Sequence, residues 1–218
     1  MRIACVGYRE WALNIYDALT NNTDHTYLII RSQAQFDEDS LRDFKPDLIL
    51  FYGWSWYVAE TLLQDYTCLM LHPSPLPKYR GGSPIQNQII AGEKNSKVSI
   101  FIMNDEIDAG DIIGQEDISL EGTLLSIFKQ IEEVGFRLTL KVISDGLKPE
   151  PQNHANSTYF KRRKETDSEI TIEELTGNTS EFLFNKIRML ADPYPNAYIK
   201  TNDGKRLVIL DARIEDES

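Results

Sequence analysis

The chain has 218 residues, of which 41% are hydrophobic and 26% are charged. These proportions are ordinary for a globular protein and exclude a collagen-like, disulfide-stapled or fully disordered chain. The 34 acidic and 23 basic residues give a formal charge of −11, which disfavours a dedicated nucleic-acid binder because negative charge repels a phosphate backbone. The two cysteines, Cys5 and Cys68, lie in apolar runs and fit a reduced, cytoplasmic compartment.

No membrane or export segment is expected. Charged residues at Arg9, Glu10 and Asp17 interrupt what would have to be the apolar core of a signal peptide. No run approaches the ~18–20 apolar residues that span a bilayer. We therefore expect a cytoplasmic protein without a membrane partner.

Short apolar runs alternate with helical patterns over the first two thirds of the chain. Strands are expected at residues 2–7, 26–30, 48–52, 68–71, 97–103 and 112–120. Helices are expected at residues 11–19, near 41–44, at 58–63, from 84 onward and at 124–143. Strands that are apolar on both faces and alternate with helices indicate an α/β fold, with a Rossmann-like, mostly parallel sheet flanked by helices. Ligands in such sheets lie beyond the carboxyl ends of the strands.

The composition becomes polar and charged after Gly146, which predicts a linker or an extended crossing segment. A helix is expected at residues 180–190, followed by a hairpin around Asn202-Asp203-Gly204. We therefore divide the chain into a first domain at residues 1–148 and a linker with a small C-terminal α+β unit at residues 149–218.

His72 is the first candidate for chemistry. It follows an apolar strand and opens the segment HPSPLPKYRGG, which has three prolines and two glycines in eleven residues. Such a segment forms an ordered loop, and prolines that restrict the backbone hold an imidazole in the fixed geometry that catalysis requires. The alternative is a histidine that merely ends a strand.

The second candidate is the segment NDEIDAGD at residues 104–111, with four acidic residues in eight. If it ends a strand of the same parallel sheet, its carboxylates can meet His72, and a carboxylate beside histidine favours the imidazolium form. Such a histidine can act as an acid, a base or an electrostatic stabiliser. The alternative is a solvated acidic turn. Neither an EF-hand pattern nor clustered Cys and His residues occur, so no metal is expected.

Two further segments could bind a ligand. The loop from Lys78 to Gly82 precedes a predicted helix start, where backbone N–H groups and two cations could receive a phosphate or carboxylate. The stretch YGWSWY at residues 52–57 follows the third predicted strand, where a flat ligand could stack. The alternatives, a loop kept soluble by its charges and plain core packing, stay open.

Two motifs resemble those of the folate-dependent formyltransferases. HPSPLPKYRGGSPIQ, from His72, is similar to the pattern HPSLLP-x-x-RG-x-x-P-I-Q, and DAGDI, from Asp108, is similar to D-x-G-D-I. A third piece, PYPNA from Pro193, looks like the segment after the catalytic domain in the sugar and tRNA branches. The resemblance spans nearly the whole chain.

The resemblance implies that formyl transfer from 10-formyltetrahydrofolate to a primary amine is catalysed by His72 and Asp108. It places the folate across two loops, with contacts expected from Tyr52, Trp54, Tyr57, Met103, Asp105 and Ile107. The expected contacts to a sugar or phosphate come from Ser74, Lys78, Tyr79, Arg80, Gly81 and Gly82.

The chain departs from the family at one position. The family usually has asparagine two residues before the histidine, and this chain has Met70. A thioether cannot donate a hydrogen bond to an oxyanion, so Asn104, a backbone N–H or water would have to substitute.

The branches of the family differ in the acceptor amine. The acidity of the chain and the short segment after the first domain favour a small-molecule partner, a nucleotide-linked amino sugar of polysaccharide biosynthesis, over a nucleic acid. The alternatives are a short methionyl-tRNA formyltransferase and a catalytically weakened folate-binding relative. A homodimer is left open.

Overall fold

A computed structural model describes residues 1–216 and has one main sheet of six strands in the order β2-β1-β3-β4-β6-β7. The strands are β1 (Arg2–Val6), β2 (Thr26–Ile30), β3 (Leu48–Phe51), β4 (Cys68–His72), β6 (Asn95–Ile102) and β7 (Ile112–Ser119). The first four strands in this order pair in parallel, whereas β6 and β7 pair antiparallel with their neighbours. The predicted Rossmann-like, mostly parallel sheet is confirmed.

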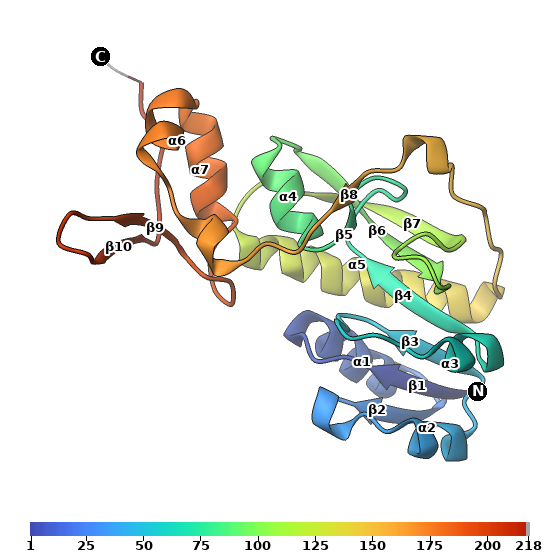
Figure 1. Cartoon of the computed structure of the whole chain (residues 1–218). Helices are drawn as coiled ribbons and strands as arrows, with labels where there is room; N and C mark the ends of the chain where they lie inside the picture. The colour runs from blue at the N-terminus through green and yellow to red at the C-terminus, as the bar shows by residue number, and fades with distance from the viewer. Residues whose placement is uncertain (217–218) are drawn as a thin grey trace.

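Helices cover both faces of this sheet (Figure 1). The helices are α1 (Glu10–Asn22), α2 (Glu38–Phe44), α3 (Glu60–Asp65), α4 (Pro84–Ile90), α5 (Leu124–Asp145), α6 (Ile172–Gly177) and α7 (Ser180–Arg188), with short 3-10 turns at Gln33–Gln35, His154–Asn156 and Glu165–Ser168. Within residues 1–216, no helix combines the length and the apolar character that crossing a membrane requires.

The pattern of β1 explains why the strand is apolar throughout. Ile3 and Cys5 pack into the core beneath α1 and α5, while Ala4 and Val6 pack into the core on the side of α2 and α3. Because successive side chains of a strand point to opposite faces, a strand buried on both faces needs apolar residues at every position.

The direction of β6 corrects one expectation. Because β6 is antiparallel to β4, with His72 opposite Ser99 and Leu69 opposite Ile102, the carboxyl end of β6 does not lie beside that of β4. The loop after β6 instead folds back along the sheet, starting from a hydrogen bond that Met103 N donates to Cys68 O at 2.8 Å. Asp108 therefore reaches the end of β4 through this loop and not through parallel strand ends.

The segment that follows α5, the crossing segment, runs back over the predicted first domain. Glu150 exchanges two backbone hydrogen bonds of 2.8 Å with Ile112 at the start of β7. Further on, β8 (Tyr159–Phe160) pairs in parallel with β5 (Arg80–Gly81). The predicted crossing segment is thus present, and it contacts the proline-rich loop. A division of the chain at residue 148 stays a prediction, as does the inclusion of residues 217 and 218, which lie outside the described residues.

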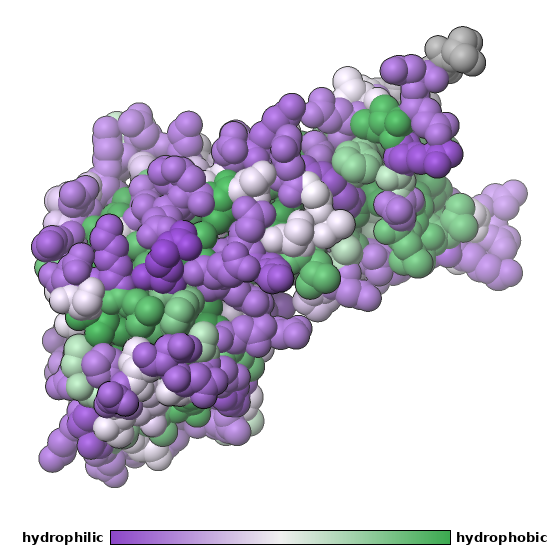
Figure 2. Space-filling view, turned by 180° about the vertical axis from the view of Figure 1, so that it is seen from behind, coloured by the Kyte–Doolittle hydropathy of each residue, from purple (hydrophilic) through white to green (hydrophobic). Residues whose placement is uncertain are grey.

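The remaining elements form a small unit at one end of the molecule (Figure 1). It contains α6, α7 and the antiparallel hairpin of β9 (Ala197–Lys200) and β10 (Arg206–Ile209), which confirms the α+β appendage and the predicted hairpin. Gly204 in the turn has a φ of 78°, a left-handed conformation that favours glycine. Figure 2 shows hydrophobic side chains gathered over this unit, where exposed apolar residues include Ile172, Leu175, Leu207, Val208 and Leu210.

Candidate active site

A cavity of about 850 Å³ opens where β1, β3 and β4 end. The parallel pairing of these strands brings three loops together, those that begin after Val6, Phe51 and His72. Further parts of the walls come from the loop after β6, the start of α4, the run that follows β8 and the segment from Pro193 to Pro195. The cavity therefore lies where ligands are expected in an α/β sheet.

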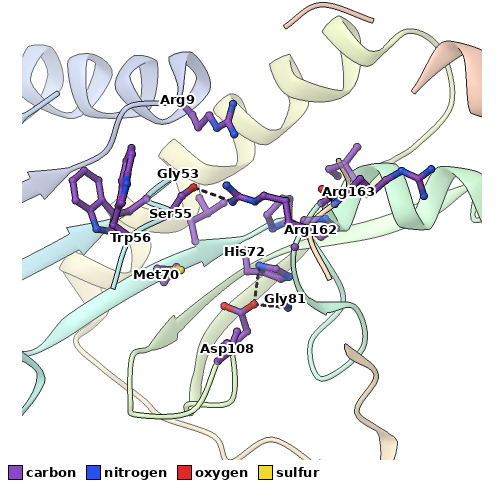
Figure 3. A pocket seen from close by; sticks show the side chains of 18 of the residues that line it. Arg9, Gly53, Ser55, Trp56, Met70, His72, Gly81, Asp108, Arg162 and Arg163 are labelled. Atoms are coloured by element: carbon purple, nitrogen blue, oxygen red, sulfur yellow. Dashed lines mark hydrogen bonds and ion pairs between the residues drawn. The ribbon is translucent and has the colours of Figure 1, made fainter. Parts of the chain in front are cut away.

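His72 and Asp108 face each other in this cavity (Figure 3). His72 Nδ1 lies 3.5 Å from Asp108 Oδ2, and both side chains are buried. His72 Nε2 lies 2.8 Å from the carbonyl oxygen of Tyr79. Both ring nitrogens thus face oxygen acceptors, an arrangement that the doubly protonated imidazolium satisfies.

The Asp108 carboxylate is fixed from its other side. Asp108 Oδ2 accepts a hydrogen bond of 2.7 Å from the backbone N–H of Gly81, in the proline-rich loop (Figure 3). Asp108 also has a φ of 52°, a left-handed conformation that is uncommon for residues other than glycine. The Asp108 carboxylate thus connects its own motif to two residues of the other motif, His72 and Gly81.

Met70 and His72 are separated by one residue of β4, so their side chains lie on the same face of the strand. Met70 lines the cavity and offers no hydrogen-bond donor there. Asn104 also lines the cavity and places an amide group at its wall, while its Oδ1 accepts a hydrogen bond of 3.1 Å from Glu106 N.

The predicted folate contacts separate into two groups. One group lines the cavity and contains Trp54, Tyr57, Met103, Asp105 and Ile107. Trp56, from the same predicted stretch at residues 52–57, also lines it. Tyr52 does not belong to this group: the side chain is fully buried in the core, with its hydroxyl 3.0 Å from Thr139 Oγ1. Burial raises the pKa of Tyr52 well above its ordinary value. The expected contact from Tyr52 does not fit this placement.

The predicted sugar or phosphate contacts separate in the same way. Gly81 and Gly82 line the cavity. Ser74, Lys78, Tyr79 and Arg80 are not among the residues that line it. The Ser74 hydroxyl donates to Lys78 O at 2.9 Å, and the buried Arg80 donates to Gln152 Oε1. The side chains of Ser74, Tyr79 and Arg80 are buried, whereas that of Lys78 is exposed outside the cavity.

A basic rim was missed by the sequence analysis. Four cations line the cavity, from the loop after β1 and the run after β8: Arg9, Arg162, Arg163 and Lys164. Arg162 Nη2 donates to Ser55 Oγ at 2.9 Å, and Figure 3 shows Arg9 on the same side of the cavity. The available signal was the run KRRK at residues 161–164, which is basic in an acidic chain.

The cavity wall also contains buried polar atoms that lack a partner. Within residues 1–216, Trp54 Nε1, Gln86 Nε2 and Arg163 Nε are buried without a hydrogen bond. All three residues line the cavity. Since buried donors are normally satisfied, these atoms fit a ligand that brings acceptor atoms.

The same residues fit a folate. Trp54, Trp56 and Tyr57 provide aromatic faces, with the rings of Trp54 and Trp56 tilted by 58° to each other, against which a flat ring could pack. Trp54 Nε1 and Gln86 Nε2 are donors that suit the nitrogen and oxygen atoms of a pterin ring. No group of three or more His, Cys, Asp or Glu residues that could hold a metal ion occurs within the described part of the chain.

A known protein family matches the region that contains both motifs and most of the main sheet. The family model described as formyl transferase matches residues 12–143, which include His72, Asp108 and most of the cavity. The chain belongs to the formyl transferase family. The family resemblance and the fold that it implied are thereby confirmed.

Named relatives of the chain fall on two branches of this family. A methionyl-tRNA formyltransferase from Rickettsia bellii is 32% identical over 184 residues, which cover 81% of this chain and 58% of that protein. The chain thus spans little more than half the length of such relatives. A solved structure of a methionyl-tRNA formyltransferase from Clostridium thermocellum is 29% identical and matches 96% of this chain and 97% of that chain with a TM-score of 0.84. A 4-N formyltransferase from Francisella tularensis is 20% identical, with a TM-score of 0.82 over 99% of this chain and 98% of that chain, and shares the fold.

Proposed function

We propose that this formyl transferase moves a formyl group from 10-formyltetrahydrofolate to a primary amine, with His72 and Asp108 as catalytic residues. The observation that carries the proposal is the buried contact of 3.5 Å between His72 Nδ1 and Asp108 Oδ2 at the wall of the cavity. The resemblance of the two motifs gives this pair the positions of the family's catalytic histidine and aspartate.

The chemistry needs charge stabilisation at one oxygen and removal of one proton. When the amine nitrogen forms its bond to the formyl carbon, the carbonyl electron pair moves to the formyl oxygen and creates an oxyanion. The His72 imidazolium stabilises this negative charge, while Asp108 sustains the imidazolium and accepts the proton that the amine loses. The electron pair then re-forms the carbonyl, the bond to the folate nitrogen breaks, and that nitrogen takes up the proton.

The basic rim supports an acceptor that carries negative charge. Arg9, Arg162, Arg163 and Lys164 surround one side of the cavity in a chain whose net charge is −11. Arginine is well suited to phosphate because its planar fork can donate two parallel hydrogen bonds. We therefore place a phosphate-bearing acceptor at the basic rim and not at the loop of Lys78 and Arg80.

Methionyl-tRNA is the first candidate acceptor. The Rickettsia bellii relative and the Clostridium thermocellum structure, which this chain matches over almost its full length, both bear the name methionyl-tRNA formyltransferase. This ranking reverses the order that the acidic composition favoured. Contact between tRNA phosphates and the basic rim would be local, so the overall charge does not oppose it in the way that it opposes a broad nucleic-acid surface.

A nucleotide-linked amino sugar is the second candidate. The net charge of −11 favours it, because a diphosphate contacts only the rim whereas a tRNA also approaches the acidic surface.

The homodimer and the cytoplasmic location stay predictions. The exposed apolar side chains on the hairpin at Leu207 and Val208 favour the homodimer, since a second copy could cover them.

One experiment distinguishes these acceptors. The protein is incubated with 10-formyltetrahydrofolate and either methionyl-tRNA or a panel of nucleotide-linked 4-amino-4,6-dideoxy sugars, and products are measured by mass spectrometry. We expect a product heavier by one formyl group from methionyl-tRNA. Formylation of a sugar alone would replace the first candidate by the second. Folate binding without transfer to any amine would overturn the proposed activity and support the weakened relative.

A further inference from the structure

We propose that Gln152 is a positioning residue for Asp108, and that Arg80 locks Gln152 in the required orientation. Gln152 lies in the segment that crosses back after α5, and no motif of the family resemblance included it. The inference rests on the proposed function, because it explains how the carboxylate of Asp108 comes to face His72.

The Gln152 side chain holds the backbone of the Asp108 loop. Gln152 Nε2 donates to Asp108 O at 2.9 Å and to Gly110 O at 2.7 Å. One amide group thus spans both sides of the turn that carries Asp108. Gln152 is only 5% exposed, so these hydrogen bonds are shielded from competing water.

Arg80 fixes which way this amide points. Arg80 Nε and Nη2 lie 3.1 Å and 2.7 Å from Gln152 Oε1. A guanidinium can only donate, so the amide oxygen must face Arg80 and the amide nitrogen must face the two carbonyl groups. The alternative orientation would place an N–H group against Arg80 and an oxygen against two oxygens. Only one rotamer of the amide therefore satisfies every neighbour.

The Asp108 loop needs such support. Asp108 has a φ of 52°, and Gly110 packs so closely that an added Cβ would lie 1.7 Å from Ile102 O. The crossing segment supplies a firm base for Gln152, since Glu150 exchanges two backbone hydrogen bonds of 2.8 Å with Ile112. Further along the same segment, Thr158 O accepts from Arg80 N at 2.9 Å.

The two ends of the crossing segment therefore hold the backbone of Asp108 and one hydrogen-bond partner of its carboxylate, Gly81. One end fixes the backbone of Asp108 through Gln152. The other end fixes β5, whose Gly81 N–H donates to Asp108 Oδ2 at 2.7 Å. A displacement of about 1 Å in a catalytic group can lower a rate about 10²-fold, so the loss of this support should lower turnover strongly.

The test uses Gln152→Glu as its main variant. A glutamate keeps an acceptor for Arg80 but turns a second oxygen toward the carbonyl groups of Asp108 and Gly110, so the variant separates the two contacts of Gln152. Gln152→Asn, which keeps the amide but shortens its reach, is the second variant. The matched control is Gln130→Leu, because the Gln130 amide binds the backbone of Ser119 outside the cavity. Folding of each variant is checked by thermal unfolding, and kcat and KM are measured with 10-formyltetrahydrofolate and the acceptor that the wild type formylates.

We expect Gln152→Glu to lower kcat about 10²-fold while KM for the formyl donor changes little, and we expect Gln130→Leu to keep the wild-type kcat. In an Asp108→Ala background, Gln152→Glu should cause no further loss, because Gln152 acts through Asp108. A kcat near that of the wild type in folded Gln152→Glu and Gln152→Asn, or an equal loss in the Asp108→Ala background, would overturn the inference alone. Wild-type turnover in Asp108→Ala itself would overturn the proposed function.

Discussion

His72 Nδ1 lies 3.5 Å from Asp108 Oδ2, although the two residues come from different loops and different motifs. His72 ends a strand, whereas Asp108 lies in a loop that returns from an antiparallel neighbour. The Gly81 N–H and the Gln152 amide hold the aspartate in place, so the pair depends on the proline-rich loop and on the crossing segment as well as on the sheet.

Met70→Asn tests the departure from the family pattern. Met70 shares a strand face with His72 and lines the cavity, so an asparagine there would place an N–H donor near the oxyanion. One such donor contributes up to about 3 kcal/mol, and we expect a gain in kcat of about tenfold because Asn104 or water supplies part of this stabilisation. Met70→Leu, which adds no donor, should behave as the wild type. An unchanged kcat in Met70→Asn would show that another donor already fulfils this role.

Arg162→Ala tests the basic rim. Removal of a charge-assisted hydrogen bond to phosphate costs about 1.5–3 kcal/mol, so we expect KM for the acceptor to rise at least about tenfold while KM for the formyl donor changes little. Ser55→Ala is the matched control, since it removes the hydrogen bond of 2.9 Å to Arg162 and keeps the cation. Steady-state kinetics at several salt concentrations provide the measurement. Equal KM values for the acceptor in Arg162→Ala and the wild type would contradict the binding of an acceptor phosphate at this rim.

Tyr52→Phe separates a core residue from a folate contact. The Tyr52 hydroxyl lies 3.0 Å from Thr139 Oγ1 in a fully buried position. We expect the free energy of unfolding in urea to fall by about 1 kcal/mol, while the affinity for tetrahydrofolate stays the same. A loss of folate affinity without a loss of stability would contradict this placement and restore the contact that the sequence predicted.

The pH dependence of stability tests the burial of Cys68. Burial raises the pKa of the Cys68 thiol to about 12, whereas an unfolded cysteine titrates near about 8.5. Between these values the unfolded chain loses a proton that the folded chain retains, so the free energy of unfolding should fall as the pH rises from about 8.5 to 10. Urea unfolding at several pH values should show a smaller decrease in Cys68→Ala. The same pH dependence in both proteins would contradict the burial.

The elements that the sequence predicted correctly are those with strong local signals. The apolar run of β3 and the turn residues around Gly204 leave few alternatives. The antiparallel pairing of β6 with β7 could have been predicted from the length of their connection. Residues 103–111 are fewer than the dozen or so residues that a crossover between parallel strands needs. The length of this connection therefore requires an antiparallel pair.

Only those site residues that lie within a recognisable sequence motif could be predicted. His72 and Asp108 stood out in their own segments, and the structure brings them together. The roles of Arg80 and Arg162 depend on how distant segments pack. Arg80 was expected to face a ligand, but the crossing segment covers it with Gln152, while the same segment carries Arg162 to the cavity. Which of these two arginines faces the cavity depends on how the crossing segment packs, and the residues next to each arginine in the sequence do not show it.

The most direct test of the account measures formyl transfer by the wild type, His72→Ala and Asp108→Asn, with matched folding checked by circular dichroism. Asp108→Asn keeps the size of the side chain and removes the charge that faces His72 Nδ1. We predict that the wild type produces a formylated amine and that each variant loses turnover by at least about 10²-fold with its thermal stability largely retained. Turnover near that of the wild type in either folded variant would contradict the assignment of this pair as the catalytic centre.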